Sequence, residues 1–460
     1  MNPSAPVTST FFPANGVISV EYMRRIDGTG PADMTVARPP NGASVLLLLT
    51  QSYPYDLALE GTFLEPELPH LRDAFQRVIV IPASREGGRA QVPEGIEVDE
   101  SLAAFLGDHS GRLELAVRAA FSRLLRSDLA KRPSLVARRR TLARLAVAAG
   151  QAELTRLWVR RFLARNGLTA ADCLAYTFWC DSTTAGLALV KRESPDLVVI
   201  SRAHGADLYA ERYDPPYLPC RTFTLQHLDR LFPDSERGVG YVAEHHPWFA
   251  SRCEVARMGV ADPGFTTGRS PDGRFVVASC SRIVPIKRVD LILRAMDRAA
   301  RNRPDVQFEW HHFGDGPLKQ EIEEQARVTL GPNAKAHFPG YSSVDELFSF
   351  YRSQPVDVFL NASESEGTPV AVMEAISCGI PVIATAVGGN PEIVSEQNGW
   401  LVEPDASPDE IAAGMLTLIH RPEVAESLRQ GSRRVWERKY DADANYAAFA
   451  RLLVELRAAS

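Results

Sequence analysis

Two glutamates eight positions apart, Glu366 and Glu374, are the side chains best suited to bind a ligand rich in hydroxyl groups. Glu366 follows a buried apolar run, and Glu374 lies more than one turn inside the helix expected next. A carboxylate can accept hydrogen bonds from two adjacent hydroxyls, which a sugar or a ribose presents. The pair therefore predicts one contact to each of two such rings.

The residues between these glutamates predict the start of a helix. Gly367 permits a tight backbone path, and Pro369 suits the first helical turn. Free backbone N–H groups and the positive end of the helix dipole would face the preceding loop, which suits a pyrophosphate. The predicted contacts from this segment are Gly367, Thr368, Pro369 and Val370.

Two cations, Arg282 and Lys287, follow another predicted strand. Arginine offers a planar fork and lysine a point charge, so together they could neutralise two phosphates. Fixed cations would also stabilise the negative charge that develops on a departing diphosphate. We therefore expect a site that needs no metal ion and no other cofactor.

Glycine turns follow two further strands. Gly314 and Gly316 form one turn, and Pro339 with Gly340 forms the other. Such turns let the backbone approach a flat ring, so we expect them to border a nucleobase.

The N-terminal half offers a histidine at a strand end, His204, with Arg202 and Asp207 close to it in sequence. This position favours a catalytic role in a cleft between two domains, although a lone histidine is often structural.

Acidic and hydroxyl side chains after the first predicted strand could orient an acceptor. They are Glu60, Thr62, Glu65 and Glu67. The alternative is that the acids cap or solvate the start of a helix. Arg202 and Asp207 complete the predicted acceptor side.

Short apolar strands alternate with helices in both halves of the chain, which is typical of parallel sheets covered on both faces. The expected fold class is α/β: a pair of Rossmann-like doubly wound domains facing a central cleft. The predicted parts are an extension (1–43), an N-terminal domain (44–262), a C-terminal domain (263–438) and a final helix with an apolar face (439–460).

The segment 110–165 has no strand signal and is strongly basic. From Arg112 to Arg165 it holds fourteen Lys or Arg against three acids. We expect amphipathic helices broken near Pro133 and Gly150. They would either lie on an anionic membrane surface or present a solvated basic face.

The remaining composition excludes some classes of protein. A net charge of −6 over 460 residues gives no global signature for nucleic acid. The six cysteines are scattered and fit no zinc pattern. Neither a signal peptide nor a membrane-spanning run is visible, so we expect a cytoplasmic chain, with at most peripheral contact at the inner face of the membrane.

Residues 275 to about 405 resemble the retaining GT-B glycosyltransferases of family 4, in their bacterial polysaccharide-assembly branch. The resemblance is carried by Ser281-Arg282 with Lys287, Phe313 to Pro317, the two glutamates Glu366 and Glu374, and Ala386 to Val394. In the N-terminal half it is patchier, at Tyr53-Pro54-Tyr55 and Phe63-Leu64-Glu65.

The resemblance implies a GT-B fold in which the final helix (439–460) crosses back to the N-terminal domain. It also implies transfer of a sugar from a UDP- or GDP-linked donor to a hydroxyl of a saccharide or lipid-linked acceptor, with retention. Arg282 and Lys287 would bind the diphosphate, Glu366 the donor sugar and Glu374 the ribose. The expected catalytic residues are Arg282, Lys287, Glu366 and His204. An epimerase-like GT-B enzyme and a non-catalytic nucleotide-sugar-binding scaffold remain the alternatives.

Overall fold

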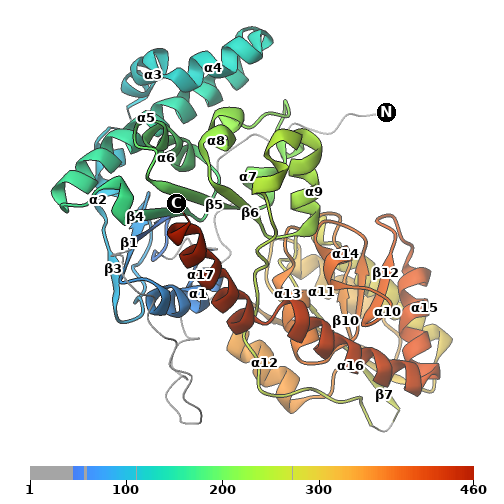
Figure 1. Ribbon diagram of the computed structural model, residues 1–460. Coiled ribbons are helices and arrows are strands. Elements are labelled where there is room, and N and C mark those ends of the chain that lie inside the picture. Colours follow the sequence, from blue (N-terminus) through green and yellow to red (C-terminus); the bar gives the residue numbers. More distant parts are fainter. Residues whose placement is uncertain (1–44, 56–59, 110, 272, 460) are drawn as a thin grey trace.

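The computed structural model describes residues 45–55, 60–109, 111–271 and 273–459. These residues form two α/β domains, and each is built on a six-stranded parallel sheet (Figure 1). The predicted extension 1–43 lies outside the described residues.

The two sheets share one strand order. The N-terminal sheet runs β3-β2-β1-β4-β5-β6, and the C-terminal sheet runs β12-β11-β10-β7-β8-β9. In each sheet the chain first adds strands toward one edge and then returns to the middle to add strands toward the other edge. This reversal lies between β1 and β4 in the N-terminal sheet and between β7 and β10 in the C-terminal sheet, and it is the point where such sheets bind ligands. The N-terminal strands are β1 (Val45–Thr50), β2 (Arg77–Pro82), β3 (Ile96–Val98), β4 (Cys173–Thr177), β5 (Val198–Ala203) and β6 (Arg230–Pro233). The C-terminal strands are β7 (Arg274–Cys280), β8 (Gln307–Phe313), β9 (Ala334–Gly340), β10 (Val358–Asn361), β11 (Val382–Thr385) and β12 (Gly399–Val402).

Helices cover both faces of each sheet. The N-terminal helices are α1 (Gly61–Ala74), α2 (Ser101–Asp108), α3 (Arg112–Phe121), α4 (Arg123–Lys131), α5 (Arg139–Arg165), α6 (Ser182–Glu193), α7 (Gly205–Leu208), α8 (Arg221–His227) and α9 (Glu236–His245). The C-terminal helices are α10 (Val289–Asn302), α11 (Lys319–Thr329), α12 (Val344–Ser353), α13 (Val370–Ser377), α14 (Asn390–Ile393), α15 (Pro408–His420), α16 (Pro422–Lys439) and α17 (Ala442–Ala458). Short 3-10 turns are η2 (Pro133–Ala137), η3 (Ala170–Asp172), η4 (Ala210–Arg212), η5 (Pro247–Arg252) and η6 (Pro285–Lys287).

The unbroken apolar strands follow from this double covering. Successive side chains of a strand point to opposite faces, so a strand between two helical layers needs apolar residues at every position. In β1, Leu46 and Leu48 belong to the core shared with α1 and α17, whereas Leu47 and Leu49 belong to the core shared with α5 and α6.

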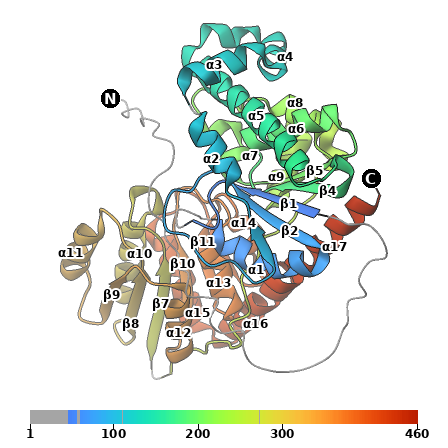
Figure 2. The same cartoon turned by 90° about the vertical axis from the view of Figure 1, so that its left-hand side faces the viewer.

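The last helix joins the two domains. α17 follows α16 and lies against α1, as both views show (Figures 1 and 2). Its residues Tyr446 and Phe449 are buried in the core of the N-terminal domain. The Phe449 ring meets Tyr176 and Phe232 edge-on, with centroids 5.6 and 5.1 Å away. The chain end thus completes the core that β1 begins.

The basic segment forms α3, α4, η2 and α5, at the end of the N-terminal domain furthest from the C-terminal domain (Figure 2). The predicted break at Pro133 is present, but the one at Gly150 is wrong, because Gly150 lies inside the 27-residue α5. A Cβ at this glycine would lie 2.6 Å from the Leu115 carbonyl oxygen. The residue therefore allows α3 and α5 to approach each other closely. The chain bends instead at Ser122, which caps α4.

Candidate functional site

The loops after β7 and β10 meet at the reversal point of the C-terminal sheet. The Glu364 amide donates to the Ile286 carbonyl at 2.8 Å. The Arg288 guanidinium donates to the Ala362 carbonyl at 2.7 Å. The predicted cations and the predicted glutamates therefore belong to one assembly of loops, at the edge where open α/β sheets bind ligands.

Lys287 and Glu366 form an ion pair across these loops. The Lys287 Nζ lies 2.7 Å from each carboxylate oxygen of Glu366. The carboxylate also accepts from Ser363 Oγ at 2.6 Å and from Asn361 Nδ2 at 3.0 Å. Two predicted site residues, one cation and one acid, are thus brought into direct contact, and neutral donors hold the acid in place.

Glu374 lies on α13, which starts just behind this pair. Its side chain is buried, and burial raises the pKa of the carboxyl to about 7. Burial also raises the pKa of the nearby Cys280 thiol. The charge of Glu374 raises that pKa further, whereas the charge of Lys287 lowers it, so both side chains lie close to Cys280. Glu374 is therefore a desolvated acid close to the same strand end, ready to accept hydrogen bonds from a ligand hydroxyl.

Arg282 is exposed, and among the residues that the structure describes it forms no ion pair. It stands five positions before Lys287 in the loop after β7, and no hydrogen bond or ion pair of the described residues joins its side chain to Lys287, Glu366 or Glu374. A free guanidinium here can bind an anion without first losing a protein partner.

The glycine turns pack against the loop that carries Arg282. A Cβ on Gly314, where φ is +141°, would lie 1.9 Å from the Ser281 oxygen, and one on Gly316 would lie 2.3 Å from the Ile283 oxygen. The Gly314 amide donates to the Gly340 carbonyl at 2.7 Å. Close approach to protein backbone therefore explains why positions 314 and 316 are glycine, and the expected contact of these turns with a nucleobase stays a prediction.

The Gly388-Gly389 turn packs in the same way against the loop of Glu366. A Cβ on Gly388 would lie 2.1 Å from the Glu366 carbonyl oxygen, and the Gly389 amide donates to the Gly367 carbonyl at 3.0 Å. This turn holds the start of α13 in place.

Asp234 links the two domains at the site, and the sequence analysis missed it. Its carboxylate accepts a hydrogen bond of 2.6 Å from Thr368 Oγ1 of the C-terminal domain. The same oxygen lies 3.4 Å from His204 Nδ1. Asp234 follows β6, a short strand bounded by Arg230 and Pro233 that carries little sequence signal.

His204 lies at the predicted strand end and is nearly buried. Its Nε2 is 3.1 Å from the Phe178 carbonyl, so both ring nitrogens face acceptors. Burial alone would lower the pKa of His204, but the hydrogen bond to Asp234 and the charges of Asp234 and Asp207 raise it. The site therefore favours a positively charged imidazolium.

Arg202 and Asp207, predicted on the acceptor side, serve the interior instead. Arg202 is 0% exposed and bonds to Glu67, to the Tyr176 hydroxyl and to the Ala256 carbonyl. Asp207 is buried and accepts from the His204 and Cys180 amides. With their polar atoms used inside the fold, these two residues position the strand end that carries His204.

Glu60 and Glu65, both predicted either to orient an acceptor or to support the start of a helix, differ in their surroundings. Glu60 is buried, and its carboxylate accepts from the amides of Gln51, Ser52 and Tyr53 and from the Trp179 indole. It therefore shapes the loop. Burial raises the pKa of Glu65 to about 7, and its side chain stays partly exposed beside Tyr53, as does Thr62. These two remain available to an acceptor.

Residues 265–435 match the model of the family described as "Glycosyl transferases group 1". This range includes most of the C-terminal domain and all of its predicted donor-side residues. The resemblance inferred from the motifs is confirmed at this level, whereas membership of family 4 and retention stay predictions.

Two curated relatives each match a little over a third of the chain. Sulfoquinovosyl transferase SQD2 of Arabidopsis thaliana is 34% identical over 170 residues, which cover 36% of this chain and 30% of that protein. D-inositol 3-phosphate glycosyltransferase of Saccharomonospora viridis is 29% identical over 183 residues, covering 37% of this chain and 42% of that protein. The chain thus spans less than half the length of either relative.

Solved structures match nearly the whole chain. The apo form of the lipopolysaccharide outer core galactosyltransferase WaaB gives a TM-score of 0.62 at 14% identity, covering 88% of this chain and 99% of that one. Anabaena Alr3699/HepE in complex with UDP gives a TM-score of 0.57 at 16% identity, with 89% and 99% covered. The fold is therefore GT-B, as the sequence predicts.

Proposed function

We propose that this protein is a glycosyltransferase that moves a sugar from a nucleoside diphosphate sugar to a hydroxyl group of a saccharide or lipid-linked acceptor. The observation that carries the proposal is the Lys287–Glu366 ion pair at the start of α13, inside the segment that matches the group 1 family. A cation for a phosphate and an acid for sugar hydroxyls meet there, beside the unpaired guanidinium of Arg282.

Donor binding would break the Lys287–Glu366 ion pair and give each side chain a group of the donor as its new partner. A diphosphate would attract the ammonium of Lys287 and the guanidinium of Arg282, assisted by the backbone amides of Gly367 and Thr368. Glu366 would then accept hydrogen bonds from the sugar, and Glu374 from the ribose. UDP and GDP are the expected nucleotides, and the UDP bound by the Anabaena neighbour supports the first.

Transfer would rely on fixed charge. Arg282 and Lys287 stabilise the negative charge on the leaving diphosphate, so the chemistry would need no metal ion. The imidazolium of His204, held by Asp234, would add positive charge at the junction of the domains. We propose retention at the anomeric carbon, with a phosphate oxygen of the leaving group taking the acceptor proton. Contact between the domains would exclude water and limit hydrolysis.

We further propose that α3 places the protein on anionic membranes. Leu113, Val117 and Phe121 lie four positions apart, and Leu113 and Phe121 are each 79% exposed. They line a groove of about 770 Å³ together with five arginines and three glutamates, and among the described residues the glutamates pair with only two of these arginines, Arg118 and Arg156. Exposed apolar side chains among arginines suit the boundary of anionic headgroups. A lipid-linked acceptor in bacterial polysaccharide or lipopolysaccharide assembly would lie at such a surface.

None of the described helices combines the length and apolar character needed to cross a bilayer.

The decisive test is donor binding by calorimetry, preceded by a screen of nucleotide sugars for nucleotide release in the presence of acceptor saccharides. The variants Lys287→Ala and Glu366→Ala should each weaken donor affinity. Glu364→Ala, an exposed acid in the same loop, is the matched control and should bind like the parent. Unchanged affinity in both test variants would reject the donor site. Release of free sugar with no acceptor product would reject transfer.

A further inference from the structure

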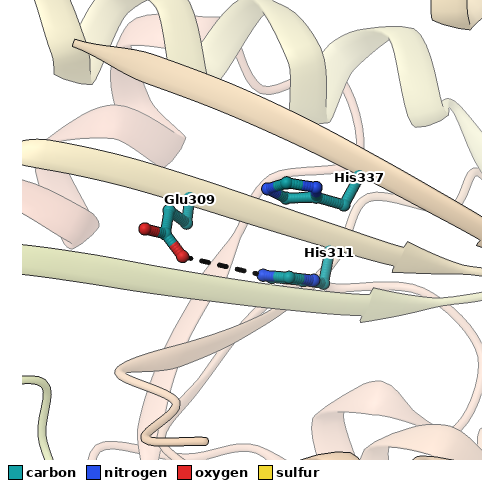
Figure 3. Close-up of side chains that lie close together, drawn as sticks. All are labelled: Glu309, His311 and His337. Carbon is teal, nitrogen blue, oxygen red and sulfur yellow. Dashed lines mark ion pairs between the residues drawn. The ribbon is translucent and has the colours of Figure 1, made fainter.

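Two histidines and a glutamate gather on the C-terminal sheet, outside the loops that carry the donor site. Glu309 and His311 lie two positions apart on β8, and His337 lies on the neighbouring β9 (Figure 3). His311 and His337 are register partners in this parallel pair of strands. Because side chains alternate along a strand, all three project from the same face.

The ligand-type atoms of this cluster are close enough to share one ion. One ring nitrogen from each histidine and a carboxylate oxygen all lie within 4.8 Å of one another. The imidazoles stack with centroids 4.5 Å apart and an interplanar angle of 15°. Glu309 Oε2 is 3.9 Å from His311 Nε2, which is longer than a hydrogen bond. The three groups therefore face one another without using up their lone pairs.

The His311 ring is held by its neighbours, whereas the His337 ring has room to change its orientation. His311 is partly buried, and its ring contacts Phe350 of α12 with centroids 4.6 Å apart. His337 is exposed on β9, the edge strand of the sheet, so its ring can turn toward a shared ion. Two cationic side chains beside Glu309 would repel such an ion. Arg274 lies 3.7 Å from Glu309, and Lys335 is the register partner of Glu309.

We propose that Glu309, His311 and His337 bind a divalent transition-metal ion of the Zn²⁺ class. Two imidazoles and one carboxylate are ligands that Zn²⁺ prefers, and three protein ligands leave a fourth position for water. The ion would cross-link β9 to β8 just before the register shift between His311 and Phe313. Beyond that shift the chain forms the Gly314 and Gly340 turns, so the ion would fix the edge of the sheet that supports them.

The test uses the full chain without an affinity tag, stripped with a chelator and titrated with Zn²⁺ in competition with a chromophoric chelator. We expect one equivalent to bind. Removing even a residue that orients a metal ligand costs about 10–100-fold in affinity, so His311→Gln and His337→Gln should each lose at least about tenfold. His420→Gln, an exposed histidine on α15, is the control and should bind normally.

Thermal stability and the spectrum of the Co²⁺ form test the same site independently of the titration. Because metal that binds only the folded state raises Tm, Zn²⁺ should raise Tm in the parent and in His420→Gln but not in His337→Gln. The visible spectrum of the Co²⁺ form should change in the same variants. The proposal is overturned if no stoichiometric binding occurs, or if His337→Gln, folded as judged by circular dichroism, binds Zn²⁺ as the parent does. Donor affinity of the stripped protein reports separately on the proposed glycosyltransferase site.

Discussion

Thr368 and Asp234 join the two domains through a hydrogen bond of 2.6 Å between a hydroxyl of the donor-side loop and a carboxylate of the N-terminal domain. Asp234 also faces His204, so one carboxylate connects the start of α13 to the histidine at the end of β5. Burial alone would raise the pKa of Asp234, but the hydrogen bonds of His204 and Thr368 and the charge of His204 lower it. The acid is therefore held ionised at the junction.

The first prediction concerns Asp234→Asn, which keeps the shape of the side chain and removes its charge. The pKa of His204 should fall, because it is the carboxylate that raises it. We expect kcat to drop by roughly 10–100-fold, with a smaller change in KM for the donor. Activity that requires imidazolium is lost as pH rises through the pKa of His204, so this limb of the pH profile should move to lower pH.

The control for this variant is Glu236→Gln, an exposed acid two positions away that pairs with Arg257. Its kinetics should match the parent. A pH profile of Asp234→Asn that overlays the parent profile would rule out a charge-based link between Asp234 and His204.

The second prediction concerns Glu374 and stability. Burial raises its pKa from 4.5 to about 7. Between these values the folded chain holds more protons at Glu374 than the unfolded chain does, so this residue makes stability fall as pH rises. Glu374→Gln should flatten that fall, by about 1–3 kcal/mol in the free energy of unfolding between pH 4.5 and 8. Urea unfolding at several pH values measures it.

Glu65→Gln offers an independent comparison, because burial also raises the pKa of Glu65 to about 7. The effect should be smaller, since Glu65 is more exposed, and should add to that of Glu374→Gln. An unchanged pH slope in Glu374→Gln would mean that its carboxyl titrates normally in the folded chain.

The third prediction concerns the exposed face of α3. The double variant Leu113→Ser/Phe121→Ser should weaken binding to vesicles that contain phosphatidylglycerol by roughly tenfold or more, because it removes two apolar side chains from the bilayer boundary. High salt should weaken the parent as well. Val328→Ser, which changes an apolar residue of α11 that is 75% exposed, should have no effect. Equal binding by the α3 variant and the parent in vesicle flotation would exclude this face.

The fourth prediction separates a structural arginine from an acceptor ligand. Arg202→Met should lower the free energy of unfolding by about 3–5 kcal/mol, because it leaves Glu67 charged and unpaired in the core. Adding Glu67→Gln should recover much of this loss. Where the single variant is folded, KM for the acceptor should equal that of the parent. A raised acceptor KM with parental stability would return Arg202 to the acceptor side.

Periodicity and turn signals predict most of the fold. The strands Val45–Thr50 and Val382–Thr385 are short, fully buried and almost wholly apolar runs, so their composition predicts them. β3 and β6 carry no comparable signal. β3 has three residues, of which only Ile96 is buried, and β6 places Arg230 and Pro233 at its ends. Short strands of this kind form through pairing with their neighbours.

The residues proposed for the donor side could be singled out from the sequence, since they lie in recognisable motifs, although their role in binding stays a prediction. Asp234 could not, because the strand that delivers it carries no signal of its own. The cluster of Glu309, His311 and His337 is hidden for another reason. The two histidines lie twenty-six positions apart in sequence, and only the register of β8 with β9 brings them together.

The crossing of α17 has a consequence for synthesis on the ribosome. Tyr176 and Phe232 belong to strands that are translated well before their partner Phe449. One side of the first domain therefore stays uncovered until α17 has left the ribosome. Chaperones should find their target on this nascent surface, and loss of the final seventeen-residue helix should expose it permanently.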